Sequence, residues 1–130
     1  MMQMSIDIAD AIQEVLNVRG HDACAPPVPE DLDQRLPLTR VRSIGGSRSQ
    51  VVLDTFNVHL DTWAVTPADA IAEANSVAAL LAEQEGQTLG GVQCYHMVIG
   101  GLPHEDKDPD RPDLPMASFM AQVSVRTINA

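Results

Sequence analysis

The chain has 130 residues, enough for one hydrophobic core and short for two, so we predict a single domain over 1–130. Its 18 acidic and 8 basic residues give a formal charge of −10, which disfavours direct binding to nucleic acid or to an anionic membrane. Aromatic residues make up only 3% of the chain, which argues against a surface that stacks nucleic-acid bases.

The cysteines and the N-terminal residues predict a soluble protein that is made and used without export. Cys24 and Cys94 are too few for a disulfide framework and lack C-x-x-C spacing, so we expect free thiols. The first residues, MMQMSIDIADAI, carry acids in place of a basic region and no long apolar run. That pattern predicts neither a signal peptide nor a membrane anchor.

An amphipathic helix is predicted within residues 1–20. Ser5 is the expected N-cap, Asp7 lies in the first turn, and Gly20 provides the stop. Apolar residues recur between them at helical spacing: Ile8, Ile12, Val15 and Leu16. The next segment, 21–36, holds three prolines and four acids, and we expect an irregular loop there.

Two strands are predicted next, over 38–44 and 51–64. Gly45 and Gly46 are expected to end the first strand, and a short Gly/Ser loop between the two indicates an antiparallel hairpin. In the second strand the apolar positions change from odd to even numbers at Asp54, which predicts a bulge or the end of pairing there.

A long helix follows, over 67–85. Thr66 is the predicted N-cap, Pro67 the first helical residue and Asp69 the third, where a carboxylate can accept from unpaired amides. Gly86 is expected to close the helix in a left-handed conformation.

Two further strands are predicted over 92–99 and 116–128, separated by a proline-rich acidic segment over 102–115 that we expect to be neither helix nor strand. The strand over 92–99 is apolar on both faces, which predicts a central position. The fold class is therefore α+β in the order α-β-β-α-β-β. We expect an antiparallel or mixed sheet of about four strands over 37–128, with two helices packed on it.

No pattern in the chain predicts a catalytic, metal or cofactor site. Asp106, Asp108 and Asp110 alternate as calcium ligands do, but an EF-hand needs Gly and Glu where this chain has Arg111 and Ala117. None of the glycine pairs forms a phosphate-binding loop. A different class of function stays open, a small binding domain or enzyme that uses three residues suited to acid–base work: His59, Asp61 and His104.

Several separated motifs together form a resemblance. They are Leu36-Pro37-Leu38-Thr39-Arg40-Val41 before Ile44-Gly45-Gly46, the strand 51–64 with its Asp54, the helix start Thr66-Pro67-Ala68-Asp69-Ala70, Leu102-Pro103 ahead of Asp108-Pro109-Asp110, and a last strand led by Pro115 and containing Arg126. In this order the chain resembles the tail terminator, or tail completion, proteins of long-tailed bacteriophages, particularly those infecting actinobacteria. The resemblance covers roughly residues 35–128, and the chain departs from the pattern at His104 and Met116.

The resemblance implies a non-enzymatic virion protein that forms a homohexameric ring at the head-proximal end of the tail. Its partners would be the major tail tube protein and the head–tail connector or stopper protein, and DNA would pass through the lumen without specific binding. The alternative in the same setting is another neck protein, a head–tail stopper or a head-closure adaptor.

Charged residues on the first hairpin and in the segment 100–115 are the expected contacts with neighbouring subunits or neck partners. Long polar loops and sheet edges are the usual places for such contacts. The predicted contact residues are Arg40, Arg42, Arg48, Asp54, His104, Glu105, Asp106, Asp108, Asp110 and Arg111.

Overall fold

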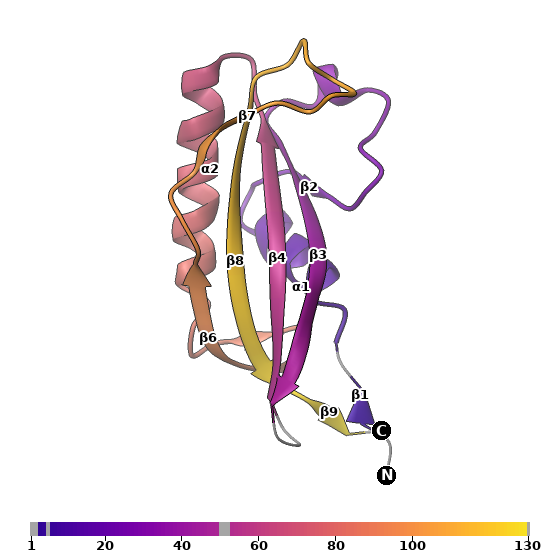
Figure 1. Ribbon diagram of the computed structural model, residues 1–130, viewed down its shortest axis with the longest axis vertical. Coiled ribbons are helices and arrows are strands. Elements are labelled where there is room, and N and C mark those ends of the chain that lie inside the picture. The colour runs from indigo at the N-terminus through magenta and orange to yellow at the C-terminus, as the bar shows by residue number, and fades with distance from the viewer. Residues whose placement is uncertain (1–2, 5, 50–52, 130) are drawn as a thin grey trace.

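The computed structural model describes residues 3–4, 6–49 and 53–129, which form two α-helices, a short 3₁₀ helix and nine strands (Figure 1). The helices are α1 (Ile8–Val18), α2 (Pro67–Ala82) and the 3₁₀ helix η1 (Leu32–Gln34). The strands are β1 (Gln3–Met4), β2 (Ala23–Cys24), β3 (Leu38–Ser49), β4 (Leu53–Trp63), β5 (Thr88–Leu89), β6 (Val92–Ile99), β7 (His104–Asp106), β8 (Met116–Arg126) and β9 (Ile128–Asn129).

The predicted α+β class is confirmed, but the sheet is larger than the four strands expected. Seven strands form the sheet, in the order β2-β3-β4-β8-β6-β5. The seventh, β7, pairs with the start of β8, on the same edge of β8 as β6. β2 is parallel to β3 and the other pairs are antiparallel, so the sheet is mixed. The three added strands have two or three residues each, too few to carry a period-two pattern.

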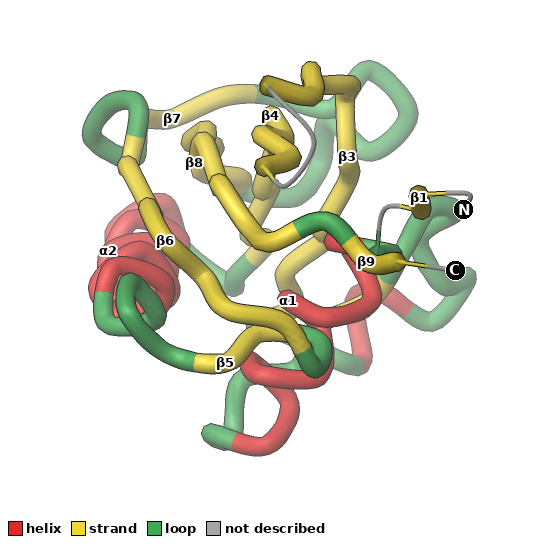
Figure 2. Tube along the Cα trace, turned by 90° about the horizontal axis from the view of Figure 1, so that it is seen from below, coloured by secondary structure: helices red, strands yellow, loops and turns green. Residues whose placement is uncertain are grey.

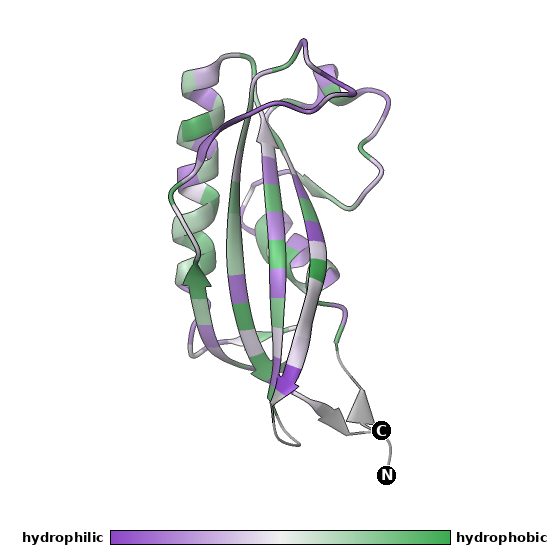
Figure 3. Cartoon of the chain, viewed as in Figure 1, coloured by the Kyte–Doolittle hydropathy of each residue, from purple (hydrophilic) through white to green (hydrophobic). Residues whose placement is uncertain are grey.

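Both helices pack on the same face of the sheet, which curls around them (Figures 1 and 2). Figure 3 shows hydrophobic and hydrophilic residues alternating along β4, as a strand with one covered face requires. Val58 and Leu60 of β4 and Phe119 and Val123 of β8 are buried in this core against Leu16 of α1 and Leu81 of α2.

The start of α2 follows the prediction and its end does not. Thr66 Oγ1 accepts the backbone N–H of Asp69 at 3.1 Å, and Pro67 begins the helix. The helix ends at Ala82, ahead of Gly86, which has a positive φ of +83° but lies in the following turn and donates its N–H to Cys94 O. In α1 the N-cap is Asp7, and Ser5 lies outside the described residues.

The prediction that β3 ends at its glycine pair is wrong. It continues to Ser49 because Gly45, with φ +110°, forms a bulge between Ser43 and Gly46. Of the two alternatives predicted near Asp54, the bulge is wrong: β4 pairs without interruption with β8 from Leu53 to Trp63, and the bulge lies in β3 instead. The residues before Leu53 that contributed to the phase change fall outside the described residues.

β6 lies next to the end of the sheet. Its two apolar faces had predicted a central position, and that prediction is wrong. Cys94 and Met97 are buried, while Tyr95 and Val98 are exposed on the other face. The acidic segment also contains one strand that we had excluded, β7, which pairs with the first residues of β8.

Candidate functional site

Polar side chains gather on the helix-free face of the sheet, where three long strands run side by side. In register, Arg40 of β3 lies opposite Asp61 of β4, which lies opposite Ser118 of β8. The Asp61 carboxylate accepts hydrogen bonds from the Arg40 guanidinium at 2.6 and 3.1 Å and from Ser118 Oγ at 2.6 Å. Only 2% of the Asp61 side chain is exposed, so this is a buried ion pair with additional hydrogen bonding.

Arg40 also joins this ion pair to a second, smaller hydrophobic cluster, formed by Leu32, Leu38, Trp63 and Met116. Its guanidinium lies 5.0 Å from the centroid of the Trp63 ring, a cation–π distance, and 4.0 Å from Asp108 Oδ2. Arg40 and Asp108, both predicted contact residues, therefore lie together within the subunit. Both are largely enclosed, so they hold the loop over 107–115 onto the sheet.

The order of contacts around Asp61 does not suit nucleophilic catalysis. His59 Nε2 lies 2.9 Å from Asp61 Oδ1, the same oxygen that accepts from Ser118 Oγ. A serine nucleophile needs the imidazole between hydroxyl and carboxylate, whereas here the carboxylate lies between the other two groups. His104 pairs in register with Ser118, but its ring nitrogen contacts Leu102 O at 3.3 Å.

Burial of the Asp61 carboxyl raises its pKa. Hydrogen bonds from Ser118 and Arg40, together with the charges of His59 and Arg40, lower the pKa by more than burial raises it, so the pKa lies below its ordinary value. Asp61 is thus held ionised. A general base needs a pKa near the working pH, so this shift is opposite to the one that catalysis would require.

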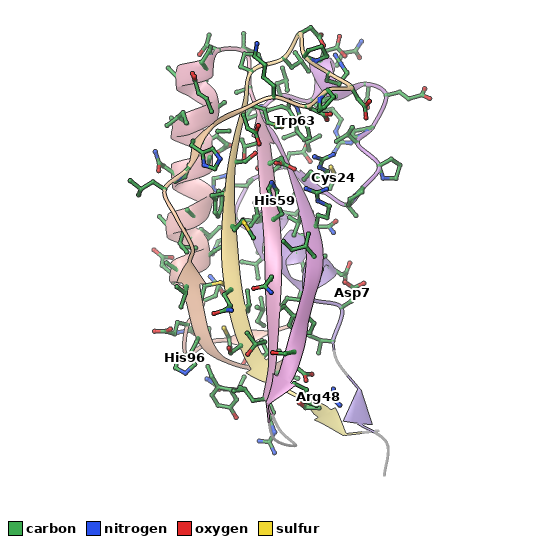
Figure 4. All side chains as sticks on the ribbon, viewed as in Figure 1. Asp7, Cys24, Arg48, His59, Trp63 and His96 are labelled. Carbon is green, nitrogen blue, oxygen red and sulfur yellow. The ribbon has the colours of Figure 1, made fainter. Side chains whose placement is uncertain are left out.

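Arg48 and Asp54 form a separate pair at the far end of the hairpin from Trp63 (Figure 4). They are opposite each other in the β3–β4 register, and the Arg48 guanidinium contacts both oxygens of the buried Asp54 carboxylate. Arg42 lies between the two ends, and its exposed side chain has no hydrogen bond or ion pair within the described part of the chain. Of the ten predicted contact residues, Arg48 and Asp54 therefore lie at one end of the sheet, Arg42 lies between the ends, and the other seven lie toward the opposite end.

The acidic segment is a structured loop with several internal hydrogen bonds. Asp106 Oδ1 accepts the N–H of Lys107 at 2.8 Å, and Asp108 Oδ1 accepts that of Asp110 at 2.9 Å. Arg111 pairs with Asp113 at 3.2 Å. Across the described ranges, no three His, Cys, Asp or Glu side chains converge as a metal site would require.

An open cavity of about 500 Å³ lies between this loop and the start of α2, bounded by Pro67, by 105–107 and by 112–116. Its walls combine prolines, Leu114 and Met116 with the charged residues of 105–107 and Asp113.

Both thiols are free, as predicted. Burial raises the pKa of the Cys94 thiol, and Glu85 raises it further, so a reactive thiolate is disfavoured. Burial also raises the pKa of the half-buried Cys24.

Ser118 and Trp63 complete the Asp61 network, and sequence reasoning missed both. The available signal for Ser118 was a polar residue among Ala117, Phe119 and Ala121. That signal was not sufficient, because Ser118 shares a face with Asp61 only once β8 is placed beside β4. The pairing of distant strands is information that a single sequence does not contain.

In the described ranges, neither helix is long and apolar enough to cross a membrane. No protein-family model matches the chain, and no curated protein matches it by sequence.

Proposed function

We propose that this chain is a virion structural protein, the tail terminator of a long-tailed bacteriophage. It would form a six-membered ring at the head-proximal end of the tail tube, stop tube polymerisation, and present the docking surface for the head–tail connector. The resemblance of residues 35–128 motivates this proposal, and the features of the fold described next support it.

The observation that carries the proposal is an open sheet with two different free edges. Beyond Arg40, β3 has no strand on its outer side among the described strands, and β6 has only the two-residue β5 on its own outer side. A ring requires heterologous contacts, in which two different surfaces of the same subunit meet. Unpaired sheet edges offer such surfaces because their backbone groups are ready to pair.

The polar network on the sheet favours a structural role over an enzymatic one. The Arg40–Asp61 and Arg48–Asp54 pairs tie β3 to β4 at both ends of the hairpin. Each carboxylate is buried and held by its arginine, which suits a rigid wall segment. A ring of six copies at −10 each would carry −60, and this negative field would keep passing DNA from adhering.

Mass measurement and negative-stain microscopy of the purified chain test the proposal. We expect rings with six-fold symmetry, and tubes of limited length when the chain is added to polymerising tail tube protein. Rings that bind the head connector but leave tube length unchanged would favour a stopper or head-closure adaptor. A monomer at every concentration, stabilised by a small ligand, would contradict a ring-forming role.

A further inference from the structure

The outer edge of β3 is open over most of its length. β2 pairs only with Thr39 and Arg40, and the N–H of Thr39 points outward to Asp22 O. The backbone N–H groups of successive residues in a strand point to alternate sides, so Val41 and Ser43 also direct their N–H groups away from β4. An edge of this kind accepts another strand, and exposed Ile44 adds an apolar side chain to it.

The opposite edge of the sheet is open at the same level. Register through β4 and β8 aligns Ser47 of β3 with His96 of β6, by way of Thr55 and Ser124. On the N-terminal side of His96, the backbone of Cys94 is already hydrogen-bonded to Gly86 and Gln87, in the turn before β5. On the C-terminal side of His96, the N–H of Met97 donates only to the side chain of Glu85, at 3.1 Å, and Glu85 is exposed.

Strand directions also match for neighbouring copies. β3 is antiparallel to β4, β4 to β8, and β8 to β6, so β3 and β6 run in opposite directions within one subunit. A rotation about an axis near the strand direction preserves these directions. The β6 edge of one copy would therefore meet the β3 edge of the next as an antiparallel pair, which continues the sheet.

Charge distinguishes the two edges and matches them to each other. Residues 38–49 hold three arginines and no carboxylate, whereas 67–103 hold four carboxylates and no lysine or arginine. Arg42 is exposed beside one edge, and Glu83 and Glu85 are exposed beside the other. Arg40 and Arg48 are paired with carboxylates of β4, so the edge charge rests on Arg42. Two β3 edges would bring the Arg42 side chains of both copies together, so a symmetric β3–β3 contact is disfavoured.

We propose that copies of this chain join through their sheets, the Val41–Ser49 edge of one copy pairing antiparallel with the Tyr95–Ile99 edge of the next. This proposal rests on the ring assembly above and assigns the surfaces that build it. On docking, the N–H of Met97 exchanges its contact with Glu85 for a backbone acceptor on the neighbouring β3.

Paired cysteines test which edges meet. We would combine Ser47→Cys with His96→Cys and treat the assembled protein with a short bifunctional maleimide, since paired strands lie only about 5 Å apart. The expected result is a ladder of covalent species, from dimer to closed ring, on a denaturing gel. Each single variant should give no ladder, because a heterologous contact places the two positions on different copies.

Two controls accompany the ladder. The unmodified chain reports on Cys24 and Cys94, and Ser47→Cys with Ala72→Cys places the second thiol on the exposed side of α2. Dimers from Ser47→Cys alone, or an equal ladder from the Ala72 pair, would overturn the edge assignment. A ring by mass without a ladder would overturn it as well and leave the proposed function intact, whereas a monomer by mass would overturn both.

A backbone variant gives a second test. Ser43→Pro removes an outward N–H and leaves the hydrogen bonds to β4 in place, so it should abolish ring formation while Ser43→Ala preserves it. If Ser43→Pro destabilises the monomer, the cysteine ladder decides. Normal rings from a folded Ser43→Pro variant would contradict pairing at this edge.

Discussion

Asp61 is the residue on which the helix-free face depends, because it joins all three long strands. Its carboxylate connects Arg40, His59 and Ser118, and little of it reaches solvent. Removal of one member of a buried ion pair costs more than the pair contributes, since the remaining charge stays buried without its partner.

Asp61→Ala should therefore destabilise the fold by about 3 kcal/mol, because it leaves the Arg40 guanidinium enclosed. Denaturant unfolding of the monomer measures the change. Asp113→Ala is the matched control: it breaks the exposed Arg111–Asp113 pair and should cost less than about 1 kcal/mol. Equal losses for the two variants would contradict the burial argument.

The depressed pKa of Asp61 also predicts an acid dependence of stability. A carboxyl whose pKa is lower in the folded than in the unfolded chain stabilises the fold fully above its unfolded value, here near 3.8. That contribution disappears as the pH falls through the lower, folded value.

Unfolding free energies of the wild type and Asp61→Asn should therefore differ by a constant amount above about pH 5 and converge below about pH 3.8. Denaturant titrations across this range check the prediction. A gap that widens in acid would show that Asp61 is not stabilised in its ionised form.

At the scale of elements, the β3–β4 hairpin depends on the close approach of two backbones at the bulge. A Cβ atom on Gly46 would lie 2.1 Å from Thr55 O and 2.9 Å from Phe56 Cα, so the strands would have to separate. Gly46→Ala should destabilise the protein by about 2 kcal/mol or more.

Gly101→Ala is the control for this substitution, because a Cβ there meets no atom within 4 Å. We expect a change within about 0.5 kcal/mol in the same unfolding experiment. A tolerant Gly46 would mean that the bulge can relax without loss of strand pairing.

Local signals predicted the long elements well, and non-local pairing explains what they missed. The Thr66–Pro67–Asp69 start of α2 and the alternation in β4 are set by neighbouring residues, and both were found. The position of β6 and the short β7 depend on which distant strand lies beside them. The two-ended arrangement of the charged residues likewise required the register of β3, β4 and β8.

For the whole molecule, this register separates the acids that stabilise the subunit from those available to partners. Deletion of the whole loop over 105–113 would be the bluntest test of its role in partner contacts. Such a deletion would also destabilise the subunit, because it removes most of β7 and the buried Asp108 beside Arg40. Exposed carboxylates on the same loop offer a milder change.

A variant with Glu105→Gln, Asp106→Asn and Asp110→Asn removes three exposed charges per copy, or eighteen from a ring of six, and retains oxygen acceptors. We expect its unfolding midpoint and ring mass to match the wild type, because none of these side chains is buried. Binding of the ring to the head connector should weaken at low salt, since steering by exposed charge is strongest there. Asp108→Asn is the contrasting control and should lower stability instead, because Asp108 faces Arg40 from the loop. Connector binding with wild-type strength and salt dependence would show that this loop is not the docking surface.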